Sequence, residues 1–349
     1  MTSGVVGGIE AGRRARTRML ADAEQRIGAL LGAEQALWSA VHPRAGVPVD
    51  AITRLVESGG KRLRPTFCIT GYLAGGGRPD NDDVVAVSAA LELLHAFALI
   101  HDDVMDESAQ RRGTPTVHAQ HSAEHARQNR MGGSARFGEN AAILAGDLAL
   151  IYADGLIADD AATRAVWSEM RIELIVGQWM DVEAAAAFAT DPKLARWIAV
   201  VKSGRYTIHR PLQLGACLAG RADLMSPFET YGLAVGEAFQ LRDDLIDLFG
   251  DARTTGKPAR HDLRQHKMTL LLSLALERDE RLAERFRDDR YDPDAFADLL
   301  IATGVPAEVE ARIDALVAAG RRALAEADLS PEWRDDLGEL ARRVSYRDV

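Results

Sequence analysis

Residues 93–106 read LLHAFALIHDDVMD, and residues 239–247 read FQLRDDLID. Each stretch ends an apolar segment with two adjacent aspartates and a third aspartate three positions further on. Residues four apart on a helix lie on the same face, about one turn apart. If the first stretch is helical, Asp102 and Asp106 therefore project together.

The second stretch repeats this arrangement with Asp243 and Asp247, and Asp244 lies close enough along the helix to join them. Carboxylates at this spacing repel one another. Apolar flanks indicate packed helices, in which bare charges cost free energy. A hard divalent cation relieves both problems, and oxygen ligands without cysteine favour Mg²⁺ and allow Mn²⁺. The alternative is a solvated acidic helix end; two occurrences after apolar helices favour a metal site.

The rest of the 349-residue chain is typical of an all-α protein. Ala, Leu, Arg and Glu dominate, and alternating β-branched runs are scarce. We expect a disordered stretch at 1–14, one large helical domain over 15–349, and a polar surface loop or short insertion over 119–138. Glycine and proline punctuation sets the expected helices at 15–40, 49–58, 62–75, 82–106, 140–157, 161–187, 193–220, 227–250, 268–276, 293–303, 307–327 and 332–344.

The net charge restricts the class of ligand. The formal charge is −10, from 42 Lys and Arg against 52 Asp and Glu. Such a chain has no general basic face for nucleic acid, so cations that bind an anionic substrate must be concentrated locally. We find no signal-peptide pattern, no apolar run long enough to span a membrane, and no lipidation motif. The sequence therefore predicts a cytoplasmic protein that binds no nucleic acid and has no membrane span.

Lysine is scarce among those cations, since only five of the 42 are lysine. A lysine kept in an arginine-rich chain is a weak pointer to a site that uses a compact ammonium group. Lys61 and Arg64 follow a Gly-Gly turn at the start of a basic helix, where backbone N–H groups favour anions. Every lysine except Lys193 stands in such a candidate anion contact; these are Lys61, Lys202, Lys257 and Lys267.

Taken together, these motifs resemble those of the trans-isoprenyl diphosphate synthases, or polyprenyl synthetases. The matching stretches, in the family's order, are GGKRLRP (59–65), LLHAFALIHDDVMD (93–106), RRGTPTVH (111–118), ILAGD (143–147), GQWMD (177–181), KSGRYTI (202–208), FQLRDDLID (239–247) and TGKPARHDLRQHKMT (255–269). The resemblance implies the isoprenoid synthase fold, with long helices around a deep central cavity, and a homodimer. It also implies head-to-tail condensation of isopentenyl diphosphate with an allylic diphosphate.

The resemblance further implies a role for each matching residue. Three Mg²⁺ ions would hold the allylic diphosphate on Asp102, Asp106 and Asp243, supported by Asp103, Asp244 and Asp247. The residues that contact the allylic substrate would be Arg111, Lys202, Gln240 and Lys257, with Ser203 where the family usually has threonine. Those that bind isopentenyl diphosphate would be Lys61, Arg64, His95 and Arg112. Gln178 would line the cavity.

The chain departs from the family in one motif. The family's GxDLxxGK reads RHDLRQHK at 260–267, so Arg260 and His266 stand where the family has glycines. The departure bears on how this loop closes and on the phosphate contact expected of Lys267.

Product length should depend on the helix below the first aspartate motif. Ala98, Phe97 and Leu94 precede Asp102 by four, five and eight residues, or about 6–12 Å at 1.5 Å per residue. Phe97 is bulky enough to form a floor for the growing chain, and ordinary core packing is the alternative. By resemblance, an aromatic residue five before an uninterrupted DDxxD implies a C20 product, geranylgeranyl diphosphate, within a C15–C20 range.

Other readings remain open from the residues. A longer-chain polyprenyl synthase would share both motifs, whereas a class I terpene cyclase would not need the second set of cations. A di-iron bundle needs two Glu-x-x-His motifs, and Glu92 with His95 supplies one. His118, His121 and His125 have helical spacing that suits a transition metal, but their polar neighbours favour an exposed helix face. An acidic helical scaffold without activity is the remaining alternative.

Overall fold

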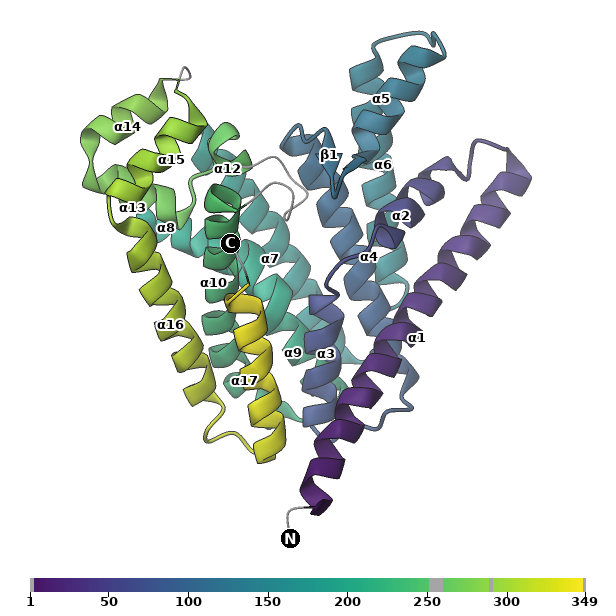
Figure 1. Ribbon diagram of the computed structural model, residues 1–349. Helices are drawn as coiled ribbons and strands as arrows, with labels where there is room; N and C mark the ends of the chain where they lie inside the picture. Colours follow the sequence, from purple (N-terminus) through teal and green to yellow (C-terminus); the bar gives the residue numbers. More distant parts are fainter. Residues whose placement is uncertain (1–2, 251–259, 289–290, 348–349) are drawn as a thin grey trace. The chain divides into compact units, whose positions relative to one another are not determined.

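The computed structural model describes residues 3–250, 260–288 and 291–347 (Figure 1). Helices account for nearly all the secondary structure of these residues, as the sequence predicts. Strands β1 (Gln110–Arg111) and β2 (Thr114–Pro115) form one small antiparallel hairpin. Contacts divide the chain into two compact units. Unit 1 comprises Met1–Ile69 and Gly77–Thr163, and unit 2 comprises Thr70–Gly76 and Arg164–Val349.

The central helix of unit 1 is α4 (Asp82–Met105), which carries the first aspartate motif at its end. Asn81 caps its start by accepting hydrogen bonds from the backbone N–H groups of Asp83 and Val84. Most of α4 is buried against other helices of the unit. The helices of unit 1 are α1 (Ser3–Val41), α2 (Val47–Glu57), the start of α3 (Leu63–Ala74), α4, α5 (Val117–Arg127) and α6 (Ser134–Asp154).

The expectation that no run is long and apolar enough to cross a membrane is wrong for α4. By length and hydropathy, α4 is the one helix among the described residues that would qualify. However, 78% of its apolar window is buried inside the protein. A core helix that is apolar on all sides meets the same criteria of length and hydropathy, because neighbouring helices surround it with apolar side chains.

Helix α5 corrects the expectation of a polar loop over 119–138. His121 and His125 lie on α5 and are buried, at 4% and 3% exposure, so the expected exposed histidine face is also wrong. The His125 ring packs 4.9 Å from that of Phe137, and its Nε2 lies 3.0 Å from the carbonyl oxygen of Met131. These contacts come from residues outside the helix, which is why the local polarity was misleading.

The central helix of unit 2 is α10 (Met225–Phe249), which carries the second aspartate motif. It packs chiefly against the π-helix η1 (Ala199–His209) and α16 (Val305–Ala323). The other helices of unit 2 are α7 (Ala161–Ala186, whose first three residues belong to unit 1), α8 (Pro192–Ile198), α9 (Arg210–Leu218), η2 (Ala222–Leu224), α12 (His261–Arg264), α13 (Leu270–Arg278), α14 (Glu280–Arg287), α15 (Pro293–Ala302) and α17 (Pro331–Ser345).

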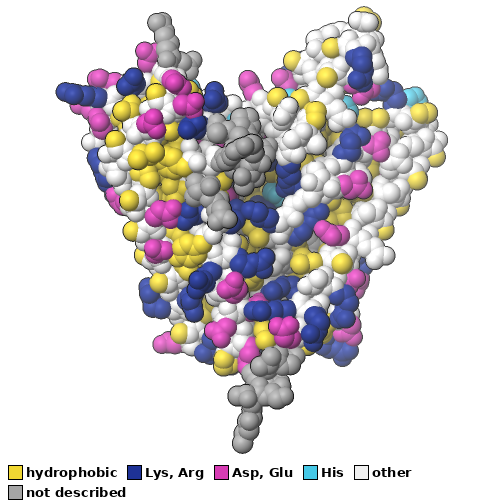
Figure 2. Space-filling view, in the orientation of Figure 1, with side chains coloured by type: hydrophobic (Ala, Val, Ile, Leu, Met, Phe, Trp, Pro, Cys, Tyr) yellow, Lys and Arg dark blue, Asp and Glu magenta, His cyan; other side chains and the backbone are white. Residues whose placement is uncertain are grey.

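The surface carries charges of both signs. On the face drawn in Figure 2, acidic and basic side chains are interspersed across the described surface. Ion pairs among the described residues include Arg278 with Glu308 at 2.6 Å and Arg221 with Asp223 at 2.6 Å.

Glycines bring η1 and α10 into direct backbone contact. The sequence predicts one helix over 193–220, but this segment is α8, the π-helix η1 and α9 in succession. A Cβ added at Gly236 of α10 would lie 2.5 Å from the Cα of Gly204 of η1, closer than real Cβ atoms approach. The two helices can therefore meet only where both side chains are absent. Lys202 and Ser203 directly precede this contact on η1, and Gln240 lies one turn beyond it on α10.

We predict that Gly236→Ala destabilises the protein by about 1–3 kcal/mol, because the added methyl group forces η1 away from α10. Thermal unfolding measures the loss. Gly28→Ala is the matched control: a Cβ at Gly28, inside α1, meets no other atom within 4 Å. That variant should be stabilised by about 0.5–1 kcal/mol. Equal melting temperatures for the two variants would contradict the close contact.

Candidate active site

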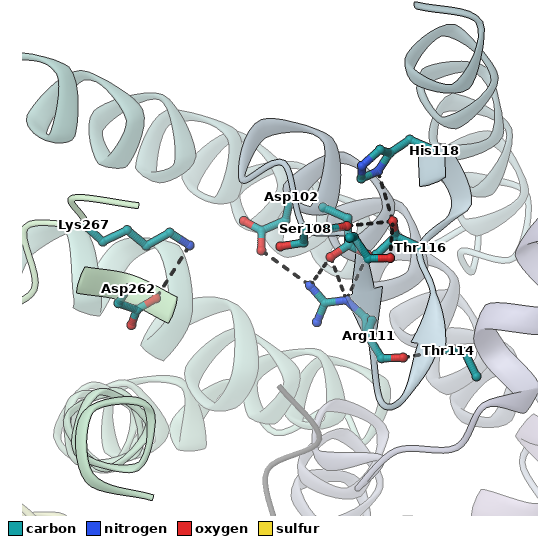
Figure 3. A network of polar contacts seen from close by, with 10 residues as sticks. Asp102, Ser108, Arg111, Thr114, Thr116, His118, Asp262 and Lys267 are labelled. Atoms are coloured by element: carbon teal, nitrogen blue, oxygen red, sulfur yellow. Dashed lines mark hydrogen bonds and ion pairs between the residues drawn. The ribbon is translucent and has the colours of Figure 1, made fainter. Parts of the chain in front are cut away.

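The first aspartate motif forms the last turn of α4 and is held by Arg111 of β1. Asp103 is buried, and its carboxylate accepts hydrogen bonds from Arg111 Nε at 3.0 Å and Nη2 at 2.7 Å. The same Nη2 lies 3.8 Å from Asp102 Oδ2 (Figure 3). Burial lowers the pKa of Arg111, but the hydrogen bonds and charge of Asp103 outweigh it and hold that pKa above its usual value. Arg111 is therefore a fixed cation beside this motif.

The hairpin that carries Arg111 is fixed at both ends. Its two turn residues, Arg112 and Gly113, have φ of 52° and 75°, the left-handed geometry that a two-residue hairpin turn requires. The Thr114 hydroxyl donates to the carbonyl oxygen of Arg111 at 2.9 Å, and Thr116 donates to that of Ser108 at 2.7 Å (Figure 3). These bonds set the position of Arg111 relative to the end of α4.

A group of cations lies around His95, which is on α4 about two turns before Asp102. The Arg112 guanidinium donates to the carbonyl oxygen of Gly59 and lies 3.3 Å from the Ser58 hydroxyl, which joins the hairpin to the loop before α3. Burial and the nearby charges of Arg64, Arg111 and Arg112 hold the pKa of His95 well below its usual value. The structure thus brings Arg64, His95 and Arg112 together, with a neutral imidazole among guanidinium groups. Lys61 is exposed in the same loop.

Glu92 does not serve as half of a di-iron motif in this structure. Its carboxylate pairs with Arg62 Nη1 at 2.7 Å, and Arg62 also binds Glu24 at 2.8 Å. The Glu92 side chain is therefore used in an ion pair that holds the loop before α3.

The three residues predicted to set product length all lie in α4. Leu94 is fully buried, Phe97 is 5% exposed and Ala98 is partly buried. The Phe97 ring meets the His101 ring edge-on at 4.7 Å, and His101 Nε2 lies 3.0 Å from the carbonyl oxygen of Ile143 on α6. His101 therefore supports Phe97, a role that the sequence did not reveal.

The second aspartate motif, on α10, is surrounded by contacts from other elements. Gln240 donates to Asp244 Oδ1 at 2.7 Å, and the backbone N–H of Asp262 donates to Asp247 Oδ2 at 2.9 Å. Asp243 Oδ1 lies 2.7 Å from Arg347 Nη2, a contact that the sequence analysis missed. Burial, with the charge of Asp262 and of the two neighbouring aspartates, raises the pKa of Asp244 well above its usual value. Negative charge is thus concentrated around the buried Asp244.

The candidate lysines of unit 2 lie beside carboxylates. Lys202 Nζ on η1 is 2.6 Å from Asp181 Oδ2 on α7, one turn after the partly buried Gln178. Lys267 Nζ is 3.9 Å from Asp262 Oδ1 (Figure 3). Asp181 and Asp262 lie within matching stretches, yet sequence reasoning assigned them no role. Lys257 lies outside the described residues.

The loop that replaces two family glycines keeps the backbone that glycine would favour. Arg260 and His266, on either side of α12, have φ of 59° and 52°. Left-handed geometry costs a non-glycine residue about 1–2 kcal/mol. Contacts within unit 2 offset this cost: Arg260 pairs with Asp294, and the His266 ring lies 5.2 Å from that of Phe286. The loop is thus closed by side-chain packing.

The residues of both motifs fit a hard divalent cation. They offer carboxylate oxygens alone. Burial, and after it the charge of neighbouring carboxylates, raises the pKa of Asp244, and a cation would relieve the repulsion among these carboxylates. Across 3–250, 260–288 and 291–347, no three His, Cys, Asp or Glu side chains are already grouped as a metal cage. Mg²⁺ is typically bound through one or two carboxylates together with substrate phosphates, so it does not need such a cage.

Comparison with known proteins places this arrangement in a family. The sequence model of the polyprenyl synthetase family matches residues 48–300, which include both aspartate motifs. Over 237 residues, the chain is 32% identical to the short chain isoprenyl diphosphate synthase of Methanocaldococcus jannaschii, covering 65% of either protein. It is 34% identical over 241 residues to the geranylfarnesyl diphosphate synthase of Aeropyrum pernix, covering 65% of this chain and 70% of that one. The alignments thus span about two thirds of these curated relatives.

A solved structure matches over nearly the whole chain. The geranylgeranyl pyrophosphate synthase from Corynebacterium glutamicum, complexed with isoprenyl diphosphate and magnesium, has a TM-score of 0.90 and 35% identity. The match covers 95% of this chain and 99% of that one. The isoprenoid synthase fold expected from the resemblance is thereby confirmed, and the chain belongs to the polyprenyl synthetase family.

Proposed function

We propose that the protein is a head-to-tail prenyltransferase that condenses isopentenyl diphosphate with allylic diphosphates to a C15–C20 trans-prenyl diphosphate, chiefly C20. The observation that carries this proposal is the pair of aspartate motifs on core helices, the first paired with Arg111 and the second with Arg347, in a chain of this family. The C20 product is supported by the similarity to the Corynebacterium glutamicum enzyme and by the buried aromatic side chain of Phe97.

The aspartates have a defined part in this reaction. Asp102, Asp106 and Asp243 would hold three Mg²⁺ ions with the allylic diphosphate. When bound, these ions act as Lewis acids that neutralise the diphosphate as it leaves. Asp103 and Asp244 support them indirectly: Asp103 anchors Arg111, and Asp244 accepts a hydrogen bond from Gln240.

Cations of the protein complete the charge neutralisation. Arg111 and Lys202 stabilise the negative charge that develops on the diphosphate when its C–O bond breaks. Arg64, Arg112 and neutral His95 bind isopentenyl diphosphate, whose double bond attacks the allylic cation; a proton then leaves, to the released diphosphate. No protein nucleophile is needed. The apolar residues below Asp102, such as Phe97, exclude the water that would quench the cation.

We further propose that both units act as one catalytic domain over residues 15–349. The family match over 48–300 supports this, because it runs through both units. Residues 3–14, which the sequence analysis expects to be disordered, form the start of helix α1 in the structure.

We also propose that two copies of the chain form a homodimer. Helix α7 exposes a stripe of large apolar side chains at helical spacing, each between 42% and 63% exposed: Ile172, Ile175, Val176, Trp179 and Val182. A second copy of the chain would bury such a face. The cytoplasmic location stays a prediction from the sequence.

We predict that Asp102→Asn and Asp243→Asn each lower Mg²⁺-dependent elongation by about 10²-fold or more, because each removes a charged metal ligand. The assay incubates the protein with labelled isopentenyl diphosphate, each allylic primer and Mg²⁺, with and without chelator, and measures product size. Asp335→Asn, at an exposed position on α17, is the control and should retain activity. Wild-type protein that makes no Mg²⁺-dependent product would refute the proposed function.

Lys202→Arg should lower kcat about 10-fold or more, because a planar guanidinium cannot take the position of a compact ammonium between Asp181 and a phosphate. Lys193→Arg, at an exposed position near the start of α8, is the matched control and should leave kcat unchanged. Steady-state kinetics with the allylic substrate varied separate the two. If both variants behave alike, Lys202 does not need to be lysine.

Phe97→Ala should lengthen the main product beyond C20, because it removes the bulk that stops the growing chain. Chromatographic sizing of the products checks this. Phe228→Ala is the control, since Phe228 is fully buried in unit 2 and its loss should cost a similar 3–5 kcal/mol, to order of magnitude, without changing product length. An unchanged product distribution for Phe97→Ala would show that Phe97 is core packing and not the floor.

A further inference from the structure

The residues that follow α17 are fastened to unit 2 next to the second aspartate motif. Arg242 of α10 donates through Nε to the carbonyl oxygen of Ser345 at 2.8 Å. The Tyr346 hydroxyl donates to Asp314 Oδ1 on α16 at 2.7 Å. Arg347 Nε donates to the carbonyl oxygen of Val344 at 2.9 Å. These bonds, from three different side chains, set where the Arg347 side chain can reach.

The Arg347 side chain lies directly against α10. Its Nη2 is 2.7 Å from Asp243 Oδ1, and its guanidinium carbon is 4.7 Å from the centre of the Phe239 ring. Phe239 and Asp243 are one turn apart on α10, so ring and carboxylate together form a seat for one guanidinium group. The Arg347 side chain is 16% exposed there, whereas that of Asp243 is 38% exposed. The Arg347 side chain is thus largely shielded from solvent, whereas the Asp243 carboxylate stays accessible to it.

We propose that Arg347 is a built-in counter-cation of Asp243, which a divalent metal ion must displace and which then binds the substrate diphosphate. The proposal rests on the function proposed above, in which Asp243 is a metal ligand. Arginine cannot give up its charge by losing a proton. A metal ion that takes Asp243 Oδ1 therefore meets a competing positive charge that has to move away.

Displacement of Arg347 couples the two ligands. A metal ion that arrives alone breaks the ion pair with Asp243 and leaves the guanidinium without an anion. When diphosphate is also present, the displaced guanidinium gains a partner with several oxygens, for which a planar fork is well suited. Metal and diphosphate should therefore each strengthen the binding of the other, and this coupling is reciprocal. Arg347 would hold back metal binding until substrate arrives.

The test measures Mn²⁺ binding to the whole chain from the electron paramagnetic resonance signal of free Mn²⁺, with and without inorganic pyrophosphate. Arg347→Gln should bind Mn²⁺ alone about 3-fold more tightly than wild type, since the competing charge is gone. The factor by which pyrophosphate strengthens Mn²⁺ binding should fall by about 3-fold or more. Arg347→Lys keeps the charge and should resemble wild type without pyrophosphate.

Arg343→Gln is the matched control, because it removes an arginine from an exposed position of α17, the helix that precedes Arg347. It should leave both measurements unchanged. Equal Mn²⁺ affinity of wild type and Arg347→Gln without pyrophosphate, including undetectable binding by both, would overturn the proposal. The proposal would also be overturned if Arg347→Gln and Arg343→Gln strengthened Mn²⁺ binding equally, because the gain would then follow from the loss of any positive charge. Mg²⁺-dependent elongation by wild type reports on the proposed function separately, so failure of the one is distinguishable from failure of the other.

Discussion

Negative charge gathered at the ends of two packed helices is the constraint on which the rest of the site depends. The aspartates of α4 and α10 follow buried apolar segments, so those that face inward cannot turn to solvent. Their charge must be balanced by other elements. In unit 1 the hairpin supplies Arg111, which forks onto Asp103. In unit 2 burial, and after it the charge of Asp262 and the neighbouring aspartates, raises the pKa of Asp244. A further cation would favour the charged form of such a carboxyl group.

Close backbone packing decides where the balancing groups stand. Gly204 against Gly236 allows η1 to meet α10, and a Cβ added at Gly177 of α7 would lie 2.9 Å from the backbone of Lys202. Lys202 is therefore placed by two glycine contacts, one directly and one two residues further along η1. The π-helical winding of η1 belongs to the same arrangement, since such segments are often found where a helix is adapted to a functional site. Glycines at these close contacts thus allow the backbone to place the charged side chain of Lys202.

The sequence predicts those parts of the structure that local patterns determine. Helices α4 and α10 follow from long apolar runs, and their aspartate faces follow from the spacing of four residues. Features that depend on distant contacts are missed. Helix α5 buries two histidines, one of which, His125, packs on Phe137. No local pattern indicates that Arg347 meets Asp243. The sequence shows that Arg260 and His266 stand where the family has glycines. It does not show that both residues adopt positive φ and make contacts within unit 2 that offset the cost. The roles of the candidate site residues remain predictions, because they depend on ligands.

Arginine and lysine have different uses around these carboxylates. The arginines that hold the framework make several bonds each, such as Arg62 with two glutamates, Arg111 with Asp103, and Arg242 with Glu310 and Ser345. A planar fork with several partners resists exchange. Lys202 and Lys267 instead place a compact ammonium group beside a carboxylate, that of Asp181 and of Asp262 respectively. Arg347 differs from these framework arginines: one nitrogen meets the carboxylate of Asp243, Nε donates to the carbonyl oxygen of Val344, and the guanidinium lies over the Phe239 ring. A cation held this way can leave when a stronger one arrives. We therefore expect displacement of a cation by a ligand to depend more on how many carboxylates the cation pairs with than on whether it is arginine or lysine.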